Sequence, residues 1–149
     1  MSPRDSSDVD NALVAKLGAD AALLALMTGG VYLDEAPEGL KRFVIVSLVD
    51  EADVAEFGRR AVEDATYLVV ARALSIVNGV ALPATVMKAA AARIDALLED
   101  GTLTVSGYTH SAMYRTARVR QTEVDEVDRS IRWFHRGGRY RVMVAPTPT

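Results

Sequence analysis

The chain has 149 residues and a mass of 16.1 kDa, half of its residues are apolar, and its formal net charge at pH 7 is −3. A chain of this size buries about two thirds of its surface on folding, so one hydrophobic core is stable without a metal or a disulfide. The absence of cysteine excludes a disulfide framework, a cysteine nucleophile and a thiolate zinc site. We expect a single domain over 1–149, with a flexible N-terminus at 1–9 and a tail at 146–149.

The N-terminal part is predicted to begin with a helix. Apolar residues recur at spacings of three and four over about 10–27, and Asp10 or Asn11 can cap the first turn. A short extended piece at 31–33 and a turn at 36–39 follow. The first long strand is therefore expected only after this turn.

Two long strands are expected next, over 42–49 and 65–76, and both faces of each strand are apolar. In the first strand Phe43, Ile45, Ser47 and Val49 alternate with Val44, Val46 and Leu48. In the second, Tyr67, Val69, Ala71 and Ala73 alternate with Leu68, Val70, Arg72 and Leu74. The charged segment 50–64 suits either a long hairpin arm or a mobile loop, and in both cases it projects from the body.

The C-terminal half is predicted to contain a second helix. Asn78–Gly79 marks a turn, Pro83 suits the first turn of the helix, and Asp100–Gly101 ends it. Its apolar stripe consists of Val86, Ala90, Ile94, Leu97 and Leu98.

Further strands are expected at 102–105 and 113–121, followed by a hairpin with strands at 131–135 and 139–144 around a tight turn at 136–138, where glycines tolerate the required backbone angles. In the strand at 113–121, Met113, Ala117 and Val119 lie on one side and Tyr114, Thr116, Arg118 and Arg120 on the other. This order of elements predicts an α+β fold, an antiparallel β-sheet of about four to five strands with two helices packed on one face.

Catalytic and cofactor signatures are not found in the sequence. No glycine-rich stretch matches a nucleotide-binding motif, and His110 and His135 lie 25 residues apart, without the spacing of metal ligands or a catalytic triad. Adjacent acidic pairs point to opposite faces in a strand and are usually solvated in a loop. We therefore expect no enzyme activity, no catalytic residue, no cofactor and no metal.

Charge is distributed unevenly along the chain. Residues 111–149 carry eight arginines and four acidic residues, whereas 1–110 carry 9 basic and 16 acidic residues. The arginines alternate with aromatic residues, which suits a nucleic-acid face, an assembly surface or solvated strand faces. Overall acidity disfavours nucleic acid, and the acidic part of a neighbouring copy would complement the arginines.

The strands with two apolar faces raise the question of what covers the face away from the helices. A monomer rarely leaves such a patch open, so we expect self-association or docking, the alternative being that loops or the 50–64 segment fold back over it. The residues that we expect in the interface are Arg115, Arg118, Arg120, Trp133, Arg136 and Arg139, with Asp50, Glu51, Asp53, Glu56, Arg59 and Arg60 from the projecting segment.

Ordered similarity along the chain also suggests a family. The stretches are Ala12–Asp20, Gly30–Pro37, Phe43–Leu48, Tyr67–Arg72, Lys88–Gly101 and Ile131–Val142. Together they resemble the tail terminator (tail completion) proteins of long-tailed bacteriophages of the actinobacteriophage type. The resemblance covers about 10–145, and none of the stretches is a catalytic signature.

The resemblance implies an α+β subunit without enzyme activity or cofactor. It implies a hexameric ring at the head-proximal end of the tail tube, in the neck of a virion assembled in the host cytoplasm. Such a ring stops tube polymerisation, contacts the tail tube protein and the head-tail connector, and lets genomic DNA pass through its lumen without sequence-specific binding. In a closed ring the contacts are head-to-tail, so an acidic patch must meet a basic one. An acidic lumen, for which Asp50, Glu51, Asp53 and Glu56 are candidates, would repel DNA phosphates.

Two other functions remain open at this point. A head-closure or adaptor protein of the head-to-tail connector shares the small size and the ring, and a nucleic-acid-binding module would use the Arg-rich C-terminal strands.

We expect no membrane partner, because no stretch approaches the ~20 apolar residues that span a bilayer and the N-terminus lacks the apolar run of a secretory signal.

Overall fold

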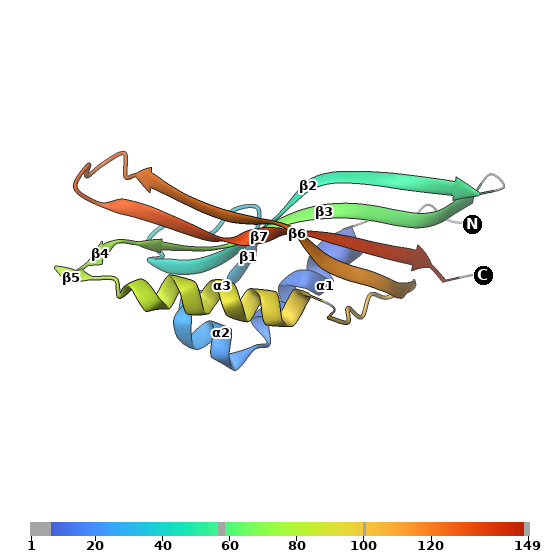
Figure 1. The fold of residues 1–149 in the computed structure, drawn as a ribbon, viewed down its shortest axis with the longest axis horizontal. Helices are drawn as coiled ribbons and strands as arrows, with labels where there is room; N and C mark the ends of the chain where they lie inside the picture. Colours follow the sequence, from blue (N-terminus) through green and yellow to red (C-terminus); the bar gives the residue numbers. More distant parts are fainter. Residues whose placement is uncertain (1–6, 57–58, 100, 148–149) are drawn as a thin grey trace.

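The structure is a computed structural model that describes residues 7–56, 59–99 and 101–147 (Figure 1). The helices are α1 (Ser7–Gly18), α2 (Ala21–Leu26) and α3 (Ala84–Leu98). The strands are β1 (Val31–Leu33), β2 (Arg42–Glu56), β3 (Arg59–Leu74), β4 (Ile76–Val77), β5 (Val80–Ala81), β6 (Tyr108–Val124) and β7 (Arg132–Pro146).

The fold is α+β, as predicted. Five strands form one sheet in the order β1-β2-β3-β7-β6, and β4 and β5 form a separate pair around the predicted turn at Asn78–Gly79. All three helices cover one face of the large sheet, while its long hairpins extend past the helices at both ends (Figure 1). The sheet is antiparallel except that β1 runs parallel to β2, with Val31 opposite Val44.

The segment 50–64 continues the sheet wherever its backbone is described. β2 and β3 stay paired from Asp50 opposite Thr66 to Glu56 opposite Arg59, with a register shift after Leu48. Of the two arrangements considered for this segment, the structure shows the hairpin (Figure 1). At the chain ends, α1 begins at Ser7 within the segment expected to be flexible, and residues 1–6 and 148–149 lie outside the described part.

The alternating pattern of the two central strands is confirmed by burial. The helix-facing residues of β2 and β3 that are fully buried are Val44, Val46, Tyr67, Val69, Ala71 and Ala73. Helix α3 adds Met87, Ala90, Ile94 and Leu98 to the same core, whereas Val86 and Leu97, which were also expected there, are only half-buried. No helix in the described part of the chain is long and apolar enough to cross a membrane.

The helix expected over 10–27 is instead two helices. α1 ends at Gly18, and Asp20 caps α2 by accepting a hydrogen bond from the Leu23 backbone N–H at 2.9 Å. The apolar spacing continues through the break, because Leu13, Leu17, Leu23 and Met27 are all fully buried. Apolar periodicity alone therefore does not reveal where the helix is interrupted.

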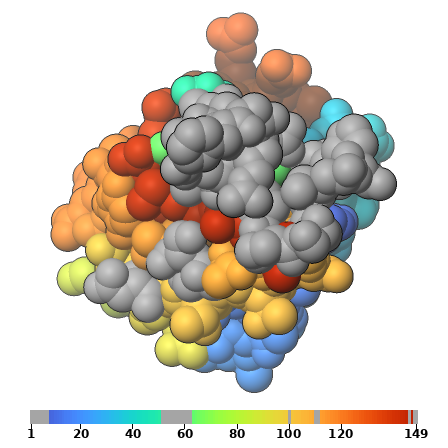
Figure 2. Space-filling model, turned by 90° about the vertical axis from the view of Figure 1, so that its right-hand side faces the viewer, coloured from blue at the N-terminus to red at the C-terminus, as the bar shows by residue number. Residues whose placement is uncertain are grey.

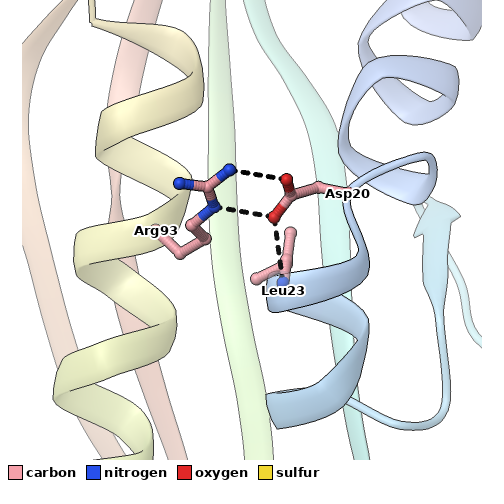
Figure 3. Close-up of polar contacts among 3 residues, drawn as sticks. All are labelled: Asp20, Leu23 and Arg93. Carbon is pink, nitrogen blue, oxygen red and sulfur yellow. Dashed lines mark hydrogen bonds and ion pairs between the residues drawn. The ribbon is translucent and has the colours of Figure 1, made fainter.

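Asp20 also joins α2 to α3. Its carboxylate accepts hydrogen bonds from Nε and Nη2 of Arg93 at 2.7 and 2.6 Å (Figure 3). These bonds lower the pKa of Asp20 from 3.8 to about 2. One side chain thus stabilises both a helix N-terminus and the packing of two helices on the sheet.

The expected hairpin at 131–144 is wrong, because β7 runs without interruption through Gly137 and Gly138. Neither glycine has a positive φ. A Cβ on Gly137 would lie 2.0 Å from the Val69 carbonyl oxygen of β3, and one on Gly138 would lie 2.9 Å from the Ala117 carbonyl oxygen of β6. The two glycines therefore allow neighbouring strands to pack closely. The turn of this hairpin lies instead at 125–131, between β6 and β7.

Two expectations for the region before β7 are also corrected. Residues 102–105 are not a strand but a loop that buries Leu103 and Val105, and β6 starts at Tyr108. In β6 a bulge lies between Arg115 and Ala117, which shifts the alternation by one residue. Arg118 and Arg120 therefore lie opposite Gly138 and Arg136, on the same face as Met113, and not on the opposite face as predicted.

We expect the substitution Gly137→Ala to lower the free energy of unfolding by about 3 kcal/mol, since its methyl group meets backbone that has no room to move. The matched control is Gly18→Ala, where a Cβ has nothing within 4 Å and the change stays within about 1 kcal/mol. Urea unfolding measures both. Equal stability of the two variants would show that β7 does not pass this close to β3.

We expect Asp20→Asn to keep the helix cap but lose the ionic pairing with Arg93, and Asp20→Ala to lose both. The midpoint of thermal unfolding should fall in the order wild type, Asn, Ala. Because the pKa of Asp20 is lowered in the folded state, the advantage of wild type over Asn is present above pH 3.8 and is lost as the pH falls towards about 2. A wild-type advantage that is the same at pH 7 and pH 2 would contradict the pairing.

Candidate assembly interface

A groove of about 340 Å³ lies between α3 and the helix-facing side of β6 and β7. We call it the cationic groove, because its charged lining consists of Lys88, Arg115, Arg118, Arg120 and Arg136 with Asp95. The remaining lining residues are Ala91, Ala92, Val119 and Gly137. The site is thus rich in positive charge and walled by small side chains.

The bulge in β6 builds this groove. After it, Arg118 and Arg120 point to the side of the sheet that carries α3, and Arg120 lies directly opposite Arg136 of β7. On α3, Lys88 and Asp95 are seven residues apart and share one face with the two alanines. Like charges opposite each other in a sheet are destabilising, so this arrangement favours binding of an anionic group.

The acidic residue of the groove is already engaged. Asp95 pairs with Nη1 of Arg115 at 3.1 Å and accepts a hydrogen bond from the Tyr140 hydroxyl at 3.0 Å. Burial and this carboxylate raise the pKa of Tyr140 well above its usual range. Within the described residues, the salt-bridge partner of Asp95 is Arg115, and no ion pair joins Lys88, Arg118, Arg120 or Arg136 to a carboxylate.

The opposite face of the sheet carries a second hollow, of about 570 Å³, which we call the outer cavity. Its floor is apolar and consists of Phe43, Ile45, Leu68 and Val70, and residues 34–40 form its wall. Phe43 and Val70 are each only 5% exposed. The apolar face that the sequence left open is therefore partly covered by a loop, as in the alternative considered, while Leu48 and Val49 farther along β2 remain exposed.

Trp133 borders this outer cavity and is held within the chain. Its ring meets that of Phe43 edge-on at 5.9 Å, and the Arg72 guanidinium lies 4.7 Å from the Trp133 ring centroid. Arg72 also pairs with Glu123 at 3.5 Å. Trp133 is therefore part of an intramolecular cluster on the face opposite the cationic groove.

The residues that we expected in the interface from the sequence lie on different faces of the sheet in the structure. Arg115, Arg118, Arg120 and Arg136 meet in the cationic groove, whereas Arg139 and Trp133 face the other side of the sheet. Asp50 is exposed on β2. The side chains of the other candidates, Glu51, Asp53, Glu56, Arg59 and Arg60, lie outside the described part of the chain.

Sequence reasoning missed Lys88 as a member of the groove, although its helical spacing from Asp95 was visible in the sequence. It also did not assign a role to the acidic wall of the outer cavity, Asp34, Glu35 and Glu38. Within 7–56, 59–99 and 101–147, no group of three or more histidine, aspartate or glutamate residues is placed to hold a metal ion.

Comparison with known proteins gives a structural neighbour. No protein-family model and no curated protein sequence matches the chain. The fold is similar to that of a solved structure described as the virion of a native gene transfer agent (GTA) particle, with a TM-score of 0.64 and 22% sequence identity. The match covers 97% of this chain and 99% of the other, so the two chains share the fold over their whole length.

We expect the stability of the fold to fall as the pH drops below 6.5 because of His135. Burial, together with the nearby Arg72 charge, lowers the pKa of His135 from 6.5. As the pH falls, His135 is therefore protonated more readily in the unfolded chain than in the folded chain, which favours unfolding. His135→Gln should flatten this pH dependence between pH 7 and 5.5, and His110→Gln is the control. Fluorescence of the single tryptophan, Trp133, reports the unfolding. An unchanged slope in His135→Gln would contradict the effect.

Proposed function

We propose that this chain is a structural protein of a phage-like virion and acts there as a tail terminator. In this role it forms a ring, hexameric as the resemblance implies, at the head-proximal end of the tail tube. The ring stops tube polymerisation and joins the tail to the head connector. The observation that carries the proposal is the end-to-end similarity of the fold to a chain of a gene transfer agent virion.

The distribution of charge supports a ring. Each subunit of a closed ring offers two different patches, one to each neighbour. The cationic groove on β6 and the acidic side chains on the connection after β1 are two such patches of opposite sign. The proposed role is structural and not enzymatic, and it requires no cofactor.

Genomic DNA passes through the lumen in this proposal and is not bound by sequence. Asp50 is an exposed carboxylate on the β2–β3 hairpin, and six copies with a net charge of −3 each make the ring acidic. Acidic walls repel phosphates and let the duplex slide. The proposed location is the neck of the virion, after assembly in the host cytoplasm.

Deletion of the gene from the genome that encodes the particle tests the function. We expect overlong or unjoined tails in electron micrographs, and a complementing wild-type copy should restore tails of normal length. Density for this fold should also surround the tail axis at the neck of wild-type particles.

Two results would contradict the tail terminator role. Finished tails beside leaking heads would identify a head-closure or adaptor protein at the same junction. Normal particles without the gene product would remove the chain from the virion altogether.

A further inference from the structure

We infer that the cationic groove of one copy receives the acidic segment 34–38 of a second copy. This inference rests on the proposed function and names the contact that holds neighbouring subunits together. It concerns two surfaces that lie at opposite edges of the sheet.

The acidic segment presents three exposed carboxylates, those of Asp34, Glu35 and Glu38. None of them forms an ion pair with a cation of the described residues. The segment begins in a defined conformation, because the Asp34 N–H donates to the Val46 carbonyl at 2.9 Å and Asp34 itself has a φ of 61°. Its charges are thus presented on a positioned turn next to the edge strand β1.

The cationic groove presents the complementary charges. Lys88, Arg118, Arg120 and Arg136 outnumber the one carboxylate of the groove, Asp95, which already binds Arg115. Arginine forks bind carboxylates through paired hydrogen bonds, and a group of several such pairs stabilises a contact where a single exposed pair does not. Carboxylates in the groove would also relieve the repulsion between Arg120 and Arg136.

The two surfaces of one copy are too far apart to meet. The acidic segment follows β1 at one edge of the sheet, the groove lies on β6 at the other edge, and three strands lie between them. The two surfaces also lie on opposite faces of the sheet, because the acidic segment borders the outer cavity and the groove opens on the helix side. Figure 2 shows the cyan atoms near residue 40 and the orange atoms of β6 on opposite sides of the molecule. A contact between them joins two copies head-to-tail and leaves one surface of each free for the next copy.

Nucleic acid is the other anionic occupant that the groove could take. The net charge of −3 and the carboxylate of Asp95 within the groove favour an acidic protein segment over a polyanion. The experiments therefore also measure binding of duplex DNA.

The absence of native cysteine makes crosslinking a clean test. The double variant Glu38→Cys with Arg118→Cys, oxidised at the highest concentration at which the chain stays in solution, should give a ladder of covalent multimers. A disulfide within one copy is excluded, because Arg118 points to the helix side of the sheet and Glu38 lies on the other face, and cysteines whose Cβ vectors point apart cannot be bridged. The matched control is Glu38→Cys with Arg129→Cys, since Arg129 is exposed in the 125–131 turn, outside the cationic groove, and should give monomers. Circular dichroism confirms that both variants fold.

Charge reversal gives a second, independent readout. Arg118→Glu with Arg120→Glu, and separately Glu35→Lys with Glu38→Lys, should each abolish self-association in sedimentation. An equimolar mixture should restore self-association, because the acidic groove of the first variant can then bind the basic segment of the second. Arg129→Glu with Arg139→Glu changes the net charge equally and should leave association unchanged.

Several results would overturn the inference. These are monomers from the groove pair, equal crosslinking in the control pair, loss of association in the charge control, or a mixture that stays dissociated. Binding of duplex DNA that is lost on reversing the groove, with self-association unchanged, would assign the groove to nucleic acid. The deletion phenotype and the neck density are independent of these outcomes, so failure of this contact and failure of the tail terminator role are distinguishable.

Discussion

The close passage of β7 between β3 and β6 is the constraint on which the rest of the structure depends. Gly137 and Gly138 allow it, because a Cβ at either position would collide with the backbone of a neighbouring strand. Gly138 also leaves room on the helix side of the sheet, where the Arg115 side chain lies next to it and Arg118 lies opposite it. The core contacts of Tyr140 and Val142 and the walls of the cationic groove therefore follow from one unobstructed stretch of strand.

A second local irregularity decides where the positive charge points. Without the bulge between Arg115 and Ala117, Arg118 and Arg120 would lie on the face of the outer cavity, beside Trp133 and Arg72. With the bulge, they meet Lys88 of α3. A shift of one residue thus separates an apolar, aromatic face from a charged one.

Much of the fold could be predicted from the sequence, because burial in β2 and β3 follows a simple alternation that Val44, Val46, Tyr67 and Val69 report directly. The failures share a physical cause. The start of α2 and the packing role of Gly137 depend on groups distant in the sequence, Arg93 for Asp20 and Val69 for Gly137. For the candidate site, the pattern of arginine and aromatic residues found all four groove arginines but also selected Arg139 and Trp133, because the sequence does not reveal which face of the sheet a strand residue takes.

The position of strand β6 at the end of the sheet also affects the tendency of the isolated chain to aggregate. It is 17 residues long and lies at the end of the sheet order, so one row of its backbone amides and carbonyls lacks a strand neighbour in the described part of the chain. Such an open edge is a template for aggregation with any other strand. The density of arginine along β6 makes that indiscriminate pairing unfavourable, since bulky cations repel a second copy of the same edge. The arginines that line the cationic groove therefore also disfavour aggregation through this edge.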